Sequence, residues 1–265
     1  MSQTISSVKP QPADKRLRDL LVSFRFWFTT LLVLVAIAVM VRLGIWQLDR
    51  LEQRRAFNAR VQAQLAQPPL ILDSLSLQEK LFDMEYRTVV VQGEYDFAHQ
   101  VALRNQAYQN RWGVALLTPL KIKGTDQAIL INRGWIPGED FLSGNWSRFD
   151  QPGEVTVKGV IRRAQTKPDF GKRSDPVPAS GEPPLKAWNL ANVEAIAQQI
   201  PYSIVPEVYI QQTEGNGTAA SLPIPAQVEL DLSEGPHLGY ALQWFTFAAI
   251  LGIGYPIFVK RRMGR

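Results

Sequence analysis

His237 is one of only two histidines in the chain, and it lies near the start of an uncharged run, residues 235–259. Imidazole is the commonest side-chain ligand for metal ions, and an ionisable group at the mouth of an apolar helix marks a candidate functional site. Tyr240, Ala241 and Trp244 follow by three, four and seven residues, so a helix places all four on one face. His237 is therefore the strongest candidate ligand, with a merely interfacial polar residue as the alternative.

A second group of candidate binding residues lies near the other end of the chain. If the two apolar runs form antiparallel neighbouring helices, Trp46 and Gln47 lie at the same level as His237. Arg42 and Arg50 could pair with carboxylates of a ligand, because guanidinium binds carboxylate well. The alternative is that both arginines only mark the edge of a membrane.

The sequence contains none of the motifs that identify zinc proteases, serine hydrolases, phosphate-binding loops or dinucleotide folds. It also contains no cysteine, which excludes thiolate metal sites and covalent haem attachment through C-x-x-C-H. His99 follows a predicted strand, and we expect it to be a solvated turn residue. These observations favour a protein that is not an enzyme.

Two stretches are long enough to cross a bilayer, whose apolar core of roughly 30 Å needs about 20 helical residues. Residues 235–259 carry no charge, and residues 26–48 carry only Arg42, whose long side chain can reach the interface. Basic residues precede the first run, as in a signal peptide, but no small-residue cleavage site follows it. We therefore predict two transmembrane helices.

Positive charge gathers at the two ends of the chain. Residues 260–265 contain four basic residues and no acid, so the C-terminus is predicted to be cytoplasmic, and with two crossings the segment 1–25 is cytoplasmic too. Residues 49–234 contain 19 Lys and Arg against 22 Asp and Glu, so the net charge of +5 comes from the ends. This distribution of basic residues indicates how the chain crosses a membrane, which we expect to be the cell inner (plasma) membrane. We expect no nucleic-acid partner.

Residues 49–234 are predicted to form one periplasmic, β-rich domain, so the fold class is an α+β membrane protein. Apolar residues alternate as in strands, and two shorter segments have helical patterns. The predicted strands are 87–95, 114–120, 128–135, 155–162 and 205–211. The predicted helices are a charged extension of the first anchor, 49–65, and 190–200, capped by Asn189 or Asn192. The proline-rich segment 167–184 is predicted to be a loop.

Within this predicted arrangement of two terminal helices around a β-rich domain, four motifs resemble the Surfeit locus protein 1 family of cytochrome oxidase biogenesis factors, in its bacterial form. They are L-G-I-W-Q-L-D-R (43–50), Y-R-T-V-V-V-Q-G-E-Y (86–95) with the following L-R-N (103–105) and G-V-A-L-L-T-P-L (113–120), I-L-I-N-R-G-W-I-P (129–137), and P-H-L-G-Y-A-L-Q-W-F (236–245). The motifs occur in the family's order, with its two-helix topology.

The resemblance implies an assembly factor for haem–copper terminal oxidases that binds haem a through His237 as an axial ligand of the haem iron. The expected binding residues are His237, Tyr240, Trp244, Trp46 and Arg50, since aromatic side chains suit a porphyrin face and Arg50 suits a propionate. The expected partners are the catalytic subunit of the oxidase and a haem a synthase as donor. A second copy of the chain could supply a second His237. The alternative is a membrane-tethered interaction module without a cofactor.

Overall fold

The computed structural model describes residues 24–168, 175–178, 182–214, 222–225 and 230–263. Residues 1–23, within the predicted cytoplasmic segment, and part of the predicted 167–184 loop lie outside this range. The chain divides into two units, residues 1–58 with 232–265 and residues 59–231. We describe each unit by itself.

The first unit is built on two long helices, α2 (Phe24–Leu65) and α5 (His237–Met263). The prediction of two long apolar helices is confirmed, and the charged extension 49–65 continues the first of them without a break. Both are long and apolar enough to cross a membrane by length and composition. Only 6 % of the apolar window of each helix is buried, so neither is the core helix of a globular domain.

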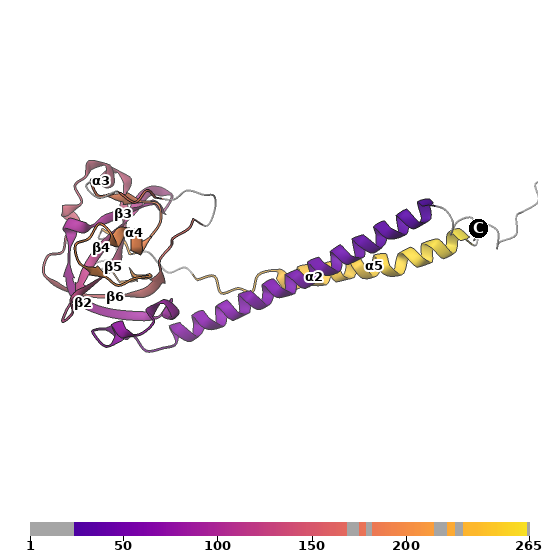
Figure 1. Cartoon of the computed structure of the whole chain (residues 1–265), viewed down its shortest axis with the longest axis horizontal. Helices are drawn as coiled ribbons and strands as arrows, with labels where there is room; N and C mark the ends of the chain where they lie inside the picture. The colour runs from indigo at the N-terminus through magenta and orange to yellow at the C-terminus, as the bar shows by residue number, and fades with distance from the viewer. Residues whose placement is uncertain (1–23, 169–174, 179–181, 215–221, 226–229, 264–265) are drawn as a thin grey trace, which may run out of the picture. The chain divides into compact units, whose positions relative to one another are not determined.

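The two helices lie side by side, as Figure 1 shows, and small residues form their contact. A Cβ added to Gly44 would lie 2.6 Å from Cε1 of Phe245, so only glycine allows this approach. A Cβ on Gly252 would lie 3.8 Å from Cδ1 of Ile37. Further along, the hydroxyl groups of Thr30 and Tyr255 are 2.7 Å apart and share a hydrogen bond. These contacts set the two helices antiparallel.

The second unit is β-rich, as predicted, and its strands form one sheet. The strands are β1 (Leu70–Leu72), β2 (Thr88–Tyr95), β3 (Val101–Tyr108), β4 (Arg111–Ile122), β5 (Gln127–Pro137), β6 (Glu154–Arg163), β7 (Ala187–Trp188), β8 (Ser203–Ile204) and β9 (Val208–Gln212). The short helices are α3 (Gly138–Ser143), α4 (Val193–Ala197) and the 3-10 turns η1 (Ser76–Gln78), η2 (Leu81–Met84), η3 (Phe97–His99) and η4 (Ser147–Phe149).

The sheet closes on itself through β2, β6, β9, β5 and β4. Each strand in this series pairs with the next, and β4 pairs back with β2 through Gly93 and Ile122. All these pairs are antiparallel except β5 with β9. Five strands in such a circuit make a small closed barrel, the class of architecture to which OB folds belong. Closure protects these strands from edge-to-edge pairing.

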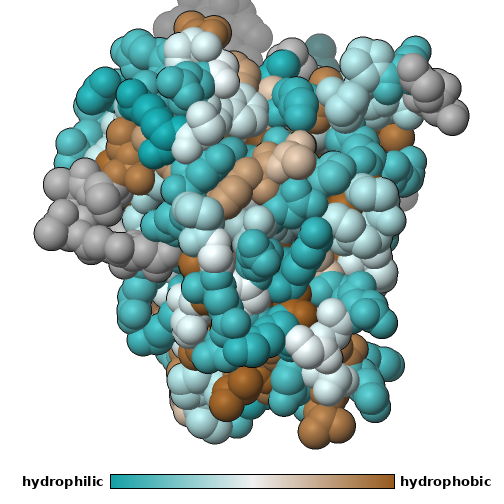
Figure 2. Space-filling model, turned by 90° about the vertical axis from the view of Figure 1, so that its left-hand side faces the viewer, coloured by the Kyte–Doolittle hydropathy of each residue, from teal (hydrophilic) through white to brown (hydrophobic). Residues whose placement is uncertain are grey.

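Alternating apolar residues fill the barrel because successive strand side chains point to opposite faces. Val89 and Val91 of β2 and Ile129 and Ile131 of β5 are fully or almost fully buried in this core, together with residues of the other barrel strands. β4 is buried continuously from Gly113 to Leu120, because two further apolar clusters cover the outside of the barrel. The face of this unit seen in Figure 2 is mostly hydrophilic.

The structure corrects several predicted boundaries. The helix predicted at 190–200 is shorter, α4, and Asn192 caps it by accepting a hydrogen bond from the Ala195 amide at 3.2 Å. The last predicted strand begins at Val208 instead of Val205, because Glu207 has a positive φ of 61°. The strand predicted at 128–135 is slightly longer, since β5 runs from Gln127 to Pro137.

Candidate functional site

His237 is the first residue of α5, and its ring contacts α2. Nδ1 of His237 lies 2.8 Å from Oε1 of Gln47, and the pair is partly buried. An amide oxygen can only accept, so a neutral imidazole that bonds to it through Nδ1 would carry its proton on Nδ1 and its free lone pair on Nε2. The site therefore presents one imidazole nitrogen that can ligate a metal ion.

Gly235 lies beside the Nε2 edge of the His237 ring. Gly235 has a φ of +67°, a conformation that residues with a side chain rarely adopt. A Cβ at this position would lie 3.4 Å from Cδ2 and 3.6 Å from Nε2 of His237, in van der Waals contact with the edge that carries the lone pair. Glycine at this position therefore adds no side chain beside the edge through which the ring could ligate a metal ion.

The segment that leads into α5, residues 232–236, is held along α2. Nδ2 of Asn58 donates to the Leu232 carbonyl at 2.6 Å, and Nε of Arg54 donates to the Ser233 carbonyl at 3.0 Å. Arg55 binds both carboxylate oxygens of Glu234 at 2.8 Å. Hydrogen bonding to this carboxylate raises the pKa of Arg55 and lowers the pKa of Glu234. These contacts fix the point at which α5 begins, and thus the height of His237 on α2.

The structure brings only some of the predicted binding residues together. The guanidinium of Arg50 lies 5.9 Å from the ring centre of Trp46 and donates to Gln53 at 3.0 Å. Trp46 and Tyr240 are about half exposed, at 44 % and 48 %, and Trp244 is partly buried with its ring 6.3 Å from that of Phe247. Tyr240 and Trp46 therefore offer aromatic surface on the outside of the helix pair, open to a ligand or to lipid.

Gln47 is the residue that the predicted binding set left out. In an antiparallel helix pair, its position along α2 places Gln47 at the same level as His237. This was the sequence signal that could have identified it. Which face of α2 it occupies depends on the rotation of the helix, and the contact of Gly44 with α5 determines that rotation.

His99 is not the solvated turn residue that the sequence suggested. It lies in η3, after β2 as expected, but its Nδ1 donates to Asp96 Oδ2 at 2.8 Å and its side chain is only 31 % exposed. Asp96 also accepts from the Tyr202 hydroxyl at 2.6 Å. Burial raises the pKa of Asp96, but the hydrogen bonds from Tyr202 and His99 outweigh it, so the net pKa is lowered. Local pairing with Asp96 explains the partial burial.

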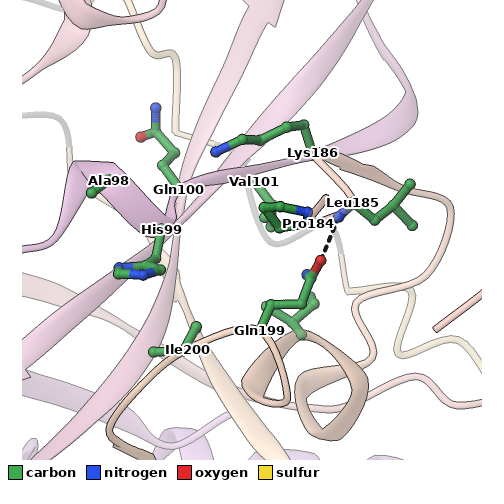
Figure 3. Close-up of a pocket in the computed structure, with 10 residues that line it drawn as sticks. Ala98, His99, Gln100, Val101, Pro184, Leu185, Lys186, Gln199 and Ile200 are labelled. Carbon is green, nitrogen blue, oxygen red and sulfur yellow. Dashed lines mark hydrogen bonds between the residues drawn. The ribbon is translucent and has the colours of Figure 1, made fainter. Parts of the chain in front are cut away.

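A cavity beside His99 is too small for a cofactor. It is lined by His99, Val101 and Lys186 among others, and Gln199 accepts a hydrogen bond from the Leu185 amide across it (Figure 3). Its volume of about 20 Å³ suffices for a single water molecule. His99 is therefore a structural residue of the β unit.

Two larger hollows on the β unit have ligand-sized volumes but no imidazole. One, of about 460 Å³, is lined by Leu81 and Pro206 among others, and the other, of about 440 Å³, is lined by Tyr108 and Trp135 among others. Within the described ranges, no three His, Cys, Asp or Glu side chains are grouped to hold a metal ion. His237 is thus the best-placed metal ligand among the described residues.

Comparison with known proteins agrees with this arrangement. A family model described as the SURF1 family matches residues 34–249, which include both Gln47 and His237. A SURF1-like protein of Rickettsia felis is 27 % identical over 233 residues, covering 87 % of this chain and 96 % of the relative. Surfeit locus protein 1 of Mus musculus is 23 % identical over 254 residues, covering 90 % and 77 %. Because the matched region spans most of the chain and includes parts of both long helices, this protein belongs to the SURF1 family.

Proposed function

We propose that this chain is a membrane-anchored assembly factor that binds haem a through His237 and assists its insertion into the catalytic subunit of a haem–copper terminal oxidase. The proposal rests on family membership and on one observation, the histidine at the start of α5 whose Nδ1 is bonded to Gln47 while Gly235, which has no side chain, lies beside its Nε2 edge. Haem a supplies an iron that takes an axial nitrogen ligand.

Membrane anchoring follows from the two helices. Their apolar windows are almost unburied, so in water they would expose many large apolar side chains, whereas a bilayer covers them. The basic residues in the last turn of α5 favour a cytoplasmic C-terminus. The β unit is then periplasmic, and His237 lies at the outer surface of an inner membrane.

The residues around His237 suit reversible binding. Gln47 bonds to the ring through Nδ1, and Gly235 adds no side chain beside its Nε2 edge. A single imidazole holds a cofactor less tightly than two and allows it to be passed on, as a delivery role requires. Trp46 and Tyr240 can cover an apolar ring system, and Arg50 can neutralise a carboxylate. A haem a synthase is the proposed donor, and a second copy of the chain could supply a further His237.

The second candidate function is a cofactor-free module that holds oxidase subunits together during assembly. If His237 proves dispensable, the two ligand-sized hollows of the β unit, which have no histidine in their lining, favour this second function. Both candidates are non-enzymatic.

The test is the composition of the oxidase in a strain that lacks this chain. We expect oxidase with less haem per catalytic subunit and largely normal copper, because a chain with no cysteine and only two histidines is poorly equipped to deliver copper. Full haem together with missing copper would refute haem delivery. Normal amounts of both metals in a smaller amount of assembled oxidase would favour the module.

A further inference from the structure

We propose that Gln47 is a positioning residue for His237, which fixes the imidazole in its Nδ1–H tautomer and turns the Nε2 lone pair outwards. The inference rests on the proposed haem ligation and adds a residue to it. It can also be tested in the haem-free protein, because the tautomer is a property of the imidazole alone.

The position of Gln47 on α2 places its amide towards α5. Gly44 and Leu51, three residues before and four after, are both buried, so Gln47 lies on the buried face of α2. An amide on an apolar face needs a hydrogen-bond partner, because an unpaired one costs free energy in such surroundings. The His237 ring supplies this partner at 2.8 Å.

The bond has a chemical consequence for His237. A neutral imidazole carries one proton, and donation from Nδ1 to the Gln47 oxygen places that proton on Nδ1. Nε2 is then an acceptor without a competing proton, which a metal ligand must be. Histidines that bind metals usually donate their other ring N–H to an oxygen, and this fixes the ring and raises its basicity.

Gly235 adds no side chain beside Nε2, where a Cβ would lie 3.6 Å away, while Nδ1 faces Gln47. The two neighbours thus act on opposite edges of the ring. Loss of such an outer partner typically weakens metal binding by about 10-fold to 100-fold. We expect Gln47→Leu to weaken haem binding by about tenfold, while Gln47→Glu keeps an acceptor oxygen and retains binding.

The first measurement uses the haem-free full chain in lipid nanodiscs, labelled with ¹⁵N-histidine and carrying His99→Gln so that His237 gives the only signals. We expect Nδ1 of His237 to have the ¹⁵N chemical shift of a protonated ring nitrogen and Nε2 that of an unprotonated one. In Gln47→Leu the Nε2–H tautomer should become populated. A wild-type ring protonated on Nε2 would overturn the inference, whatever the haem affinity.

The second measurement titrates haem a, extracted from a haem–copper oxidase, into wild type, Gln47→Leu, Gln47→Glu and Gln243→Leu. Gln243 is an exposed glutamine of α5 and serves as the matched control. The resonance Raman Fe–His stretching frequency of the reduced complex should fall in Gln47→Leu and rise in Gln47→Glu, because the Nδ1 hydrogen bond strengthens the iron–nitrogen bond. The control should match wild type in affinity and frequency.

The outcomes separate the two proposals. If His237→Ala leaves haem binding intact, the ligation proposal fails. Suppose that His237→Ala abolishes haem binding but Gln47→Leu keeps the wild-type haem affinity, Fe–His stretching frequency and His237 tautomer. Only the positioning role of Gln47 then fails. Equal losses in Gln47→Leu and Gln47→Glu would indicate a packing effect and also overturn it.

Discussion

Gly44 of α2 and Phe245 of α5 pack so closely that a Cβ on the glycine would lie 2.6 Å from Cε1 and 2.7 Å from Cζ of the ring. Such distances do not occur between real atoms, so any larger residue must displace the ring or separate the helices. The contact lies one turn from Gln47 on α2, and it therefore fixes the face on which Gln47 meets His237.

Gly44→Val should separate the helices and weaken the Gln47–His237 contact. Because the chain has no cysteine, Thr30→Cys with Tyr255→Cys gives a clean pair for cross-linking with a short bis-maleimide. We expect Gly44→Val to lower the cross-linking yield and the haem content several-fold. Gly254→Val is the matched control, because a Cβ on Gly254 would have no atom within 4 Å. Equal yields in both variants would contradict the packing role of Gly44.

Asn58→Ala should loosen the segment that leads into α5. Asn58 is only 7 % exposed, and its amide holds the Leu232 carbonyl at 2.6 Å, so its loss should cost about 1–2 kcal/mol locally. Hydrogen exchange of the backbone amides of residues 232–237 should become faster. Arg55→Ala should have a smaller effect that vanishes at high salt, because its ion pair with Glu234 is exposed. A larger effect of Arg55→Ala would refute this ranking.

Asp96→Asn should destabilise the β unit only when the native carboxylate is ionised. The folded-state pKa of Asp96 is lowered, so its contribution is fully present above the unfolded pKa of about 3.9 and is lost as the pH falls through the folded value. We expect a loss of about 1–2 kcal/mol at pH 7 that shrinks below pH 4. Thermal unfolding of the full chain in detergent measures it. A difference that stays constant over this pH range would contradict the assignment.

The proposed topology predicts where fused reporters work. Alkaline phosphatase, which is active only outside the cytoplasm, should be inactive when fused after Arg265 and active when inserted after Asp126, in the β4–β5 turn. Activity at Arg265 would place the C-terminus outside and reverse the topology.

Much of the fold could be predicted because the signals are local. The apolar runs identify α2 and α5, and the alternating valines of β2 and isoleucines of β5 identify barrel strands. β3 escaped prediction because its alternation breaks at Asn105, which has a φ of +60° where the pairing with β4 shifts. The closure of β2 onto β4 joins distant residues and leaves no local pattern.

The site was predicted less completely than the fold. His237 stands out because histidine is rare in this chain and sits beside an apolar run. Its partner Gln47 does not, because a glutamine's role depends on the rotation of one helix against the other. The bond of His99 to Asp96 also depends on a tertiary contact, since Tyr202 helps to hold that carboxylate in place.

The most direct test of the account is the absorption spectrum of the chain purified from cells that make haem a. We predict a Soret band in wild type that falls markedly in His237→Ala and hardly changes in His99→Ala, because the cavity of about 20 Å³ beside His99 is too small for a haem, whereas His237 begins the apolar helix α5. A His237→Ala spectrum equal to that of wild type would contradict ligation by His237 and leave the cofactor-free module as the better account.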